Sequence, residues 1–357
     1  MENGIITDVF MRKRKEKDLL ESTKAKIAVL DGAKAYAQLR QDVMKAGILD
    51  RAYGFYTLTS LVVFGGFFLT LYMIYITPLS LALVFWSLVL GIFVVQIGGL
   101  IHDSGHRAVF NSTKMNDILG NFCGFLVGMG YFSWNMTHNK HHAHTNQEDE
   151  DPDLELPLHA FTKKRLKSEK GIWKFLSKYQ AYLYFPLRTS VVVSRRWSNI
   201  AYFKKRKTED IWWEIILWSI GMFFWFVLPF IIFPFPKAIV LFFVVHISTG
   251  FYMSNIFAPN HKGMPQIPKG TKISFLEHQI MTSRNVYNNW FNDTLYIGLN
   301  YQIEHHLFPN CPRNKLHKIT PFVLAICKKM QLDYTQVGII ESNRIILSEL
   351  NRVARSQ

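Results

Sequence analysis

Four long apolar stretches interrupt an otherwise polar chain, at about residues 52–76, 79–101, 215–233 and 238–258. Each has about 19–25 residues, enough for a helix to cross a hydrocarbon core of about 30 Å. Only Thr77 and Pro78 separate the first pair, and residues 234–237 separate the second. The pattern predicts two helical hairpins in a membrane. Hairpins buried in a large soluble protein are the alternative, but soluble helices rarely stay uncharged on every face for so long.

Charge indicates how these hairpins are oriented. The chain has 41 Lys and Arg and a net charge of +15. Eleven of the basic residues lie in residues 1–51, 17 in residues 102–210 and 12 in residues 259–357. The positive-inside rule therefore predicts that both termini and the long middle segment are cytoplasmic. The basic surface is expected to face anionic lipid headgroups. Nucleic acid is not an expected partner, because no recognised nucleic-acid motif accompanies the charge.

These observations predict an all-α integral membrane protein, with four transmembrane helices in two hairpins and long cytoplasmic segments. We expect a cytoplasmic N-terminal segment over residues 1–51, a membrane domain over residues 52–330 and a cytoplasmic tail over residues 331–357. The apolar stretch 117–132 is too short to span reliably, so a helix at the membrane interface suits it better. The three Cys are widely spaced, which excludes a disulfide framework and a Cys-based zinc site.

The 13 histidines supply the candidate chemistry, because most of them gather at the predicted cytoplasmic ends of the spans. Spacings of three and four residues place imidazoles on one face of a helix. Neutral imidazole binds Fe, Zn, Cu and Ni alike, and one tetrahedral zinc takes only four ligands. Eight ligands therefore favour a dinuclear site. The predicted ligands are His102, His106, His138, His141, His142, His261, His305 and His306.

Other polar residues near these clusters have more ordinary explanations. His159, His246 and His317 are predicted to be structural, and His144 to lie at the surface or behind a ligand. Asp103 either accepts a hydrogen bond from a neighbouring imidazole or is a solvated loop carboxylate. The acidic run over residues 148–153 is interpreted as a solvated turn rather than a metal site.

The motifs H-D-S-G-H at 102–106, H-N-K-H-H at 138–142 and Q-I-E-H-H at 302–306, separated by membrane hairpins, resemble the three histidine boxes of the membrane fatty acid desaturase family. The resemblance covers roughly residues 50–330. It implies four spanning helices under a cytoplasmic helical cap that holds two iron ions. It also implies removal of two hydrogens from an acyl chain, with O2 as co-substrate and two electrons from an external carrier. His261 is similar to an extra histidine that family members supply after the fourth span.

The third box departs from the commonest form, because Gln302 stands where many family members have His. That variant resembles front-end desaturases, which insert a double bond between an existing one and the carboxyl end. Gln302 could offer a carbonyl oxygen to the metal, directly or through water. His278 could orient a ligand from behind or be structural.

The resemblance implies that the substrate is a fatty acyl chain on a lipid or on CoA. No heme-binding H-P-G-G motif is present, so a separate ferredoxin, flavoprotein or cytochrome b5-type donor is expected. A bacterial inner membrane is the expected location, because no organellar signal and no fused electron carrier are apparent. The double-bond position, the preferred chain length and the oligomeric state stay open.

Two alternatives remain at this point. A membrane di-iron hydroxylase acting on a lipid, sterol or carotenoid would share the same motifs. A metal transporter would place its ligands near the bilayer midplane, whereas these clusters lie at or beyond the cytoplasmic ends.

Overall fold

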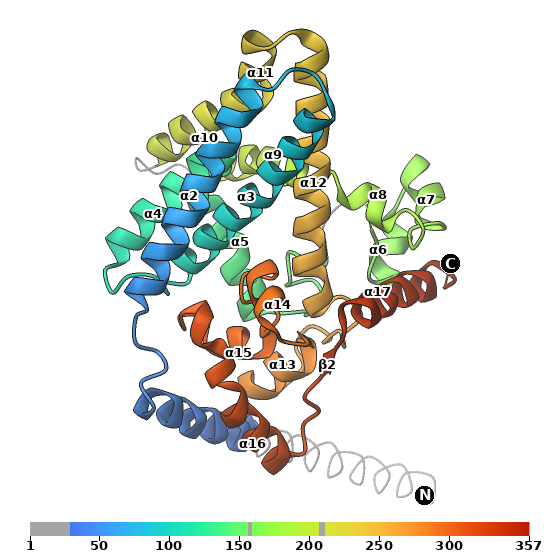
Figure 1. Ribbon diagram of the computed structural model, residues 1–357. Helices are drawn as coiled ribbons and strands as arrows, with labels where there is room; N and C mark the ends of the chain where they lie inside the picture. Colours follow the sequence, from blue (N-terminus) through green and yellow to red (C-terminus); the bar gives the residue numbers. More distant parts are fainter. Residues whose placement is uncertain (1–28, 156–158, 207–210, 357) are drawn as a thin grey trace, which may run out of the picture.

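The computed structural model describes residues 29–155, 159–206 and 211–356, and this part of the chain is almost entirely helical. Long helices stand side by side in one half of the molecule, and the shorter helices of the C-terminal third gather at one end of them (Figure 1). The two named strands in the described residues, β1 (Asn285–Val286) and β2 (Gln336–Val337), form a short parallel pair. The expectation of an all-α architecture is therefore met. Residues 1–28 of the predicted N-terminal segment lie outside the described residues.

Three of the described helices are long and apolar enough to cross a membrane: α2 (Tyr53–Ile76), α3 (Leu81–Gly105) and α12 (Phe235–His261). They match three of the four predicted apolar stretches. Large apolar side chains on them, such as Leu61 and Tyr75, are exposed, as expected for surfaces that face lipid. A buried apolar cluster with Phe67 and Leu90 packs α2 against α3.

The fourth predicted stretch, residues 215–233, does not form one continuous helix. It is divided between α10 (Ile211–Phe226) and α11 (Leu228–Ile232), with the break at Val227. Pro229 lies in the first turn of α11, where its missing N–H and its ring cannot continue the preceding helix. With 16 residues, α10 falls short of the roughly 20 that a span needs.

Two helices follow α3 and lead into the middle segment. α4 (Thr113–Val127) begins at the Ser112 cap and ends at Gly128, whose φ of +70° suits a residue without a side chain. α4 packs along α3 and α10 and corresponds to the short apolar stretch expected at the interface. After this sharp turn, α5 (Tyr131–Ala143) runs back toward the end of α3. The second histidine box lies on α5.

The chain then forms the helices α6 (Lys163–Ser168), α7 (Gly171–Ser177), α8 (Tyr184–Arg188) and α9 (Val191–Lys205). α8 and α9 pack against α12. The link between them comes so close that a side chain at Gly250 would meet the carbonyl group of Thr189. Glycine at that position therefore allows the backbone of α12 to approach this link.

The C-terminal third supplies the remaining elements: α13 (Phe275–Thr282), α14 (Trp290–Leu295), α15 (Gln302–Leu307), the 3-10 helix η1 (Arg313–Lys318), α16 (Thr320–Met330) and α17 (Ile339–Ala354). A helical segment at residues 29–45 packs on this group. Their shared apolar core includes Leu39, Val43, Leu276 and Ile303. Arg313 of η1 and Asp103 of α3 form a buried ion pair at 3.0 Å, which ties this group to the long helices.

Candidate metal centre

Four elements bring the predicted ligands together at the common end of the long helices. α3 carries His102 in its last turn, and His106 follows directly. α5 carries the second box, α12 ends at His261, and α15 carries the third box. Both long helices extend into the buried interior beyond their apolar stretches. Their final polar residues therefore meet the two short helices that bear the other boxes.

The first group contains five histidines, each offering one nitrogen within 4.8 Å of all the others: His102, His106, His138, His142 and His305. Neighbouring Nε2 atoms lie 3.0 Å apart for His106 and His138, and 3.1 Å apart for His138 and His142. Two nitrogens bound at right angles to one ion at about 2.1 Å would be about 3.0 Å apart. The spacing therefore suits five donors around one ion.

The second group contains His141, His261 and His306, all buried, with the same 4.8 Å limit. It adjoins the first group, because the rings of His142 and His306 stack with their centroids 4.1 Å apart. The second and third boxes are each divided between the two groups. Neighbouring histidines in one box point toward different centres, so no box by itself builds one site.

The outer nitrogen of each imidazole in the second group has a hydrogen-bond partner. His141 Nδ1 lies 2.9 Å from a carboxylate oxygen of Asp151. His261 Nδ1 lies 3.0 Å from the carbonyl oxygen of Thr282, and His306 Nδ1 lies 2.7 Å from Gln279 Oε1. All three acceptors favour the tautomer with hydrogen on Nδ1. The Nε2 lone pairs are then free to face a common centre, as in metal-binding histidines.

The first group is anchored in a similar way at His102. Its Nδ1 lies 3.3 Å from Asp103 Oδ1, and Asp103 also pairs with Arg313. Asp103 is 4% exposed, which excludes the solvated loop carboxylate considered from the sequence. It is held between a histidine and an arginine.

Buried atoms without partners test whether a metal ion fits this arrangement. Within the described part of the chain, His102 Nε2 and His306 Nε2 are buried and have no hydrogen-bond partner. A buried polar atom left unpaired costs about 1–3 kcal/mol. Each group therefore contains an unpaired Nε2, the nitrogen that would bind a metal, and the first group also contains an unpaired outer nitrogen, His142 Nδ1. The residues present therefore fit metal ions at both groups.

Burial also keeps most of these imidazoles neutral. It lowers the pKa of His138, His142, His305 and His306 well below the usual value, and the neighbouring histidines lower it further. Neutral imidazole is the form that binds metal. Burial also disfavours charge on His141, but Asp151 and Asp153 outweigh it and raise the pKa of that side chain.

Asp151 and Asp153 correct the interpretation of the acidic run as a solvated turn. Asp151 is 1% exposed and accepts hydrogen bonds from His141 and from the Asn146 backbone N–H. Asp153 lies 3.9 Å from His141 and pairs with Arg195 at 2.8 Å. Gln279 and Thr145, which both contact His306, were also missed. Thr145 follows the second box by three residues and Gln279 follows His278 directly, but neither residue type by itself marks a metal site.

The remaining predicted residues lie outside both groups. His278 Nε2 donates to the Thr145 carbonyl oxygen at 2.7 Å, which fits a supporting position behind the site. His246 lies between Arg196 and the Phe242 carbonyl group. His144 is half-buried and contacts Gln147. His159 is buried beside Tyr184.

Gln302 lies at the second group, as its place in the third box suggests. Its amide nitrogen lies 2.8 Å from His261 Nε2, and its oxygen accepts from Asn260 Nδ2 at 2.9 Å. Asn260 Oδ1 is buried without a partner in the described residues. Amide oxygen and nitrogen have nearly the same shape. If the oxygen and nitrogen atoms exchange places in the side-chain amides of both Gln302 and Asn260, the hydrogen bond between the two residues is kept. The Gln302 oxygen then points toward His261 Nε2.

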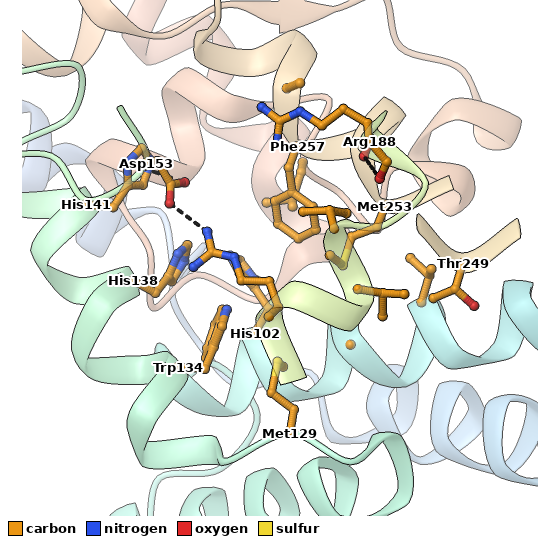
Figure 2. A pocket seen from close by; sticks show the side chains of 18 of the residues that line it. His102, Met129, Trp134, His138, His141, Asp153, Arg188, Thr249, Met253 and Phe257 are labelled. Carbon is orange, nitrogen blue, oxygen red and sulfur yellow. Dashed lines mark hydrogen bonds and ion pairs between the residues drawn. The ribbon is translucent and has the colours of Figure 1, made fainter. Parts of the chain in front are cut away.

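A cavity of about 140 Å³ opens beside these histidines. His102, His138, His141 and His261 line one side, with Trp134 next to them. Figure 2 shows Phe257, Met253 and Thr249 of α12 extending away from the histidines, with Arg188 across from His138. The walls are mostly apolar, so the site can receive a hydrocarbon chain next to the metal-binding groups.

Long apolar helices that end at a buried, multi-histidine centre beside an apolar cavity define a membrane metalloenzyme class that acts on lipid-like substrates. The model of the fatty acid desaturase family matches residues 78–338 of this chain. The chain belongs to that family, and it is an oxidoreductase that acts on fatty acyl chains in a membrane.

Curated relatives are similar over most of the chain. The Delta(5) fatty acid desaturase fat-4 of Caenorhabditis elegans is 29% identical over 327 residues, which is 84% of this chain and 69% of the relative. The Delta(6)-fatty-acid desaturase fat-3 of the same organism is 30% identical over 78% of this chain and 65% of its own length. The acyl-lipid (9-3)-desaturase of Physcomitrium patens is 33% identical over 73% of this chain. The chain spans 51% of that protein.

Proposed function

We propose that this protein is a front-end fatty acyl desaturase with two iron ions. The observation that carries the proposal is the placement of two adjoining histidine groups at one side of an apolar cavity. The Gln at position 302 and the names of the relatives, which include Delta(5) and Delta(6) desaturases, support the front-end assignment. The saturated pair of methylenes would lose two hydrogens, while O2, two electrons and two protons yield two waters.

One iron would be held by His102, His106, His138, His142 and His305, and the other by His141, His261 and His306 with Gln302. Five nitrogen donors exceed the four of a tetrahedral zinc site and suit a metal of higher coordination number. The bound iron would supply the oxygen activation that breaks the strong C–H bonds of an unactivated methylene.

The protein's own side chains would position the substrate and exclude water. Trp134, Phe257 and Met253 form apolar walls that can hold the acyl chain straight beside the histidines. Asp151, Gln279 and the Thr282 carbonyl group would fix the orientation of the ligands. Burial of both groups would keep bulk water away from the reacting carbons.

In the membrane, we propose that α10 and α11 together complete a fourth span, despite the break at Val227. Both termini and the metal centre would then face the cytoplasm, with residues 1–51, 52–330 and 331–357 as the three segments of the chain. Electrons would come from a separate carrier. The relatives named above are eukaryotic, so they lend no support to the expectation of a bacterial host.

The proposal is tested by expressing the chain in a host that lacks this desaturation, with a compatible electron donor and defined fatty acids. We expect a new alkene, located by gas chromatography–mass spectrometry, on the carboxyl side of an existing double bond. The His305→Ala, His306→Ala double variant should make none while inserting into the membrane at the wild-type level. His317→Ala, a histidine outside both groups, is the matched control and should keep activity.

Other products would decide against the proposal. A hydroxylated chain would move the protein to the related hydroxylase chemistry. A double bond on the methyl side of the existing one would remove the front-end assignment. Alkene formation that survives the double variant would show that the third box does not hold the metal.

A further inference from the structure

The cavity has a second polar feature at a distance from the histidines. Arg188, the last residue of α8, lines its wall and is 7% exposed. Its Nε is buried and has no hydrogen-bond partner within the described residues. In the same part of the chain, no carboxylate lies within 4.0 Å of its guanidinium group. A buried cation without a counter-charge is costly.

The other cations at this cavity are already engaged. Arg195 pairs with Asp153 at 2.8 Å. Lys262 donates to the Asp153 carbonyl oxygen at 2.8 Å. Arg196 donates to the Val127 carbonyl oxygen and lies 2.8 Å from His246. Arg188 therefore differs from these three neighbours, because among the described residues its buried Nε has neither a hydrogen-bond partner nor an ion-pair partner.

The groups behind Arg188 are neutral and supply no anion. Its guanidinium carbon lies 5.5 Å from the ring centroid of Tyr184, which is buried. His159 lies next to Tyr184, is 3% exposed, and has both ring nitrogens unpaired in the described residues. Burial, together with the charge of Arg188, lowers the pKa of His159 to about 3. Arg188, Tyr184 and His159 therefore offer hydrogen-bond donors to an anion, and none of these three side chains is itself negatively charged.

The position of Arg188 relative to α12 matters for the proposed reaction. Its carbonyl oxygen accepts from Ser254 Oγ at 3.2 Å. Ser254 precedes His261 by two helical turns, which corresponds to about 10 Å along the helix axis. A front-end reaction is measured from the carboxyl end of the acyl chain, so that end must be held at a fixed distance from the metal. Arg188 is held beside Ser254 and lines the same cavity as the histidines, so it can act as an anchor at a fixed distance from them.

We infer that Arg188 binds a phosphate oxyanion of the acyl carrier and thereby sets which carbons reach the metal centre. The inference rests on the proposed function, since it concerns the substrate of that same site. An acyl group bound as an ester or thioester has no free carboxylate, so phosphate is the anion that remains on the carrier. Guanidinium binds phosphate through two parallel N–H donors. The carrier phosphate is either that of a phospholipid headgroup or that of CoA.

Equilibrium binding to the purified, detergent-solubilised protein tests the inference without requiring turnover. Three radiolabelled ligands share one acyl chain: linoleoyl-CoA, linoleoyl lysophosphatidylcholine and uncharged methyl linoleate. Arg188→Met should weaken binding of one phosphate-bearing ligand about 10- to 100-fold, as expected for loss of a charge-assisted hydrogen bond. The same variant should change the affinity for methyl linoleate by no more than about twofold. The phosphate ligand that loses affinity identifies the carrier.

Two further variants separate binding from folding. Arg188→Lys keeps a point charge and should recover part of the affinity. Arg352→Gln, on an exposed arginine of α17, is the matched control and should bind all three ligands normally. Because Met removes an uncompensated buried charge, the ligand-free Arg188→Met protein should unfold at the same temperature as wild type or higher. If the role of Arg188 were purely structural, its replacement by Met would instead lower the unfolding temperature.

Product analysis gives a second readout. In the desaturating host, Arg188→Met should raise KM more than it lowers kcat and should spread the new double bond over neighbouring positions. Unchanged affinity for both phosphate ligands, or an equal loss for methyl linoleate, would overturn the inference. If the wild-type protein forms no alkene, the proposed function fails, while the binding comparison still decides the role of Arg188.

Discussion

At the scale of single residues, several histidines of the candidate metal centre have a hydrogen-bond partner at their outer ring nitrogen. This bond fixes the orientation of the ring and leaves its inner nitrogen available for a metal ion. Asp151, Gln279 and the Thr282 carbonyl group each fix one imidazole of the second group. Asp103 does the same for His102 in the first group. Such outer partners typically contribute 10- to 100-fold to metal affinity. The electrostatics of the centre therefore depend on residues that would never touch the metal.

Asp151→Asn tests this dependence. The amide keeps the shape of the carboxylate but loses its charge and one of its two acceptor oxygens, so His141 should be held less firmly. We expect about 10- to 100-fold weaker iron binding at the second group, measured as iron per protein at controlled free iron concentration. Glu150→Gln, in the same acidic run but paired with Lys269, should bind iron normally. Equal iron content in both variants would contradict the role assigned to Asp151.

Seven of the eight histidines could be predicted because their spacing within each box is short, whereas His261 was predicted from its place after the last apolar stretch and from the family resemblance. Their division into two groups depends on how α5 and α15 lie against α3 and α12, which no local pattern encodes. Asp151 was misjudged for the same reason. A run of five acidic residues in six positions is typical of a solvated turn, and only tertiary packing buries Asp151 against His141.

At the scale of elements, the apolar runs predicted where helices lie better than where they end. α3 continues to Gly105 and α12 to His261, each a few residues past the predicted boundary. The extra residues are polar but buried in the protein, so hydropathy alone could not include them. At residues 215–233, by contrast, one apolar run was predicted as one helix, but the helix is broken. Pro229 was the sequence signal for that break.

Gly250→Ala tests the close packing of α12 on the link between α8 and α9. The added carbon would lie 1.9 Å from the Thr189 carbonyl oxygen, and backbone atoms cannot move aside cheaply. We expect a destabilisation of about 1–3 kcal/mol and lower activity, because α8 carries part of the cavity wall. Thermal unfolding of the purified protein measures the first effect.

Gly65→Ala provides the matched control. Gly65 lies on α2, and a side chain there meets no described atom within 4 Å. Alanine also favours helix over glycine by up to about 1 kcal/mol, so this variant should be neutral or slightly more stable. A Gly250→Ala protein as stable as Gly65→Ala would show that the link is free to move.

At the scale of the whole molecule, one contact connects the end of α2 with the start of α12 at the end away from the candidate metal centre. Lys237 Nζ, at the start of α12, donates to the Tyr75 carbonyl oxygen at the end of α2 at 3.1 Å. The turn before α12 therefore lies beside the turn that follows α2. If α10 and α11 cross the membrane, both turns face the side opposite the metal centre.

Cysteine labelling tests this arrangement, because Cys123, Cys311 and Cys327 are all buried. Single cysteines replace Ser80 and Phe235 at the two turns, and Ser356 near the C-terminal end of α17; the side chains at both turns are exposed. A membrane-impermeant maleimide applied to intact cells should label the first two positions only. Label at Ser80→Cys without label at Phe235→Cys would show that α10 and α11 do not span the bilayer.

The order of the ligands along the chain has a topological consequence. The first histidine group joins His102 of α3 to His305 of α15, so an ion bound there closes a ring of about 200 residues. In the chain-entropy description of a covalent cross-link, a ring of that size is worth about 5 kcal/mol against the unfolded chain. The metal would therefore stabilise the folded state in addition to taking part in the reaction. Loss of iron would then loosen the junction between α15, with the C-terminal helices around it, and the long helix α3.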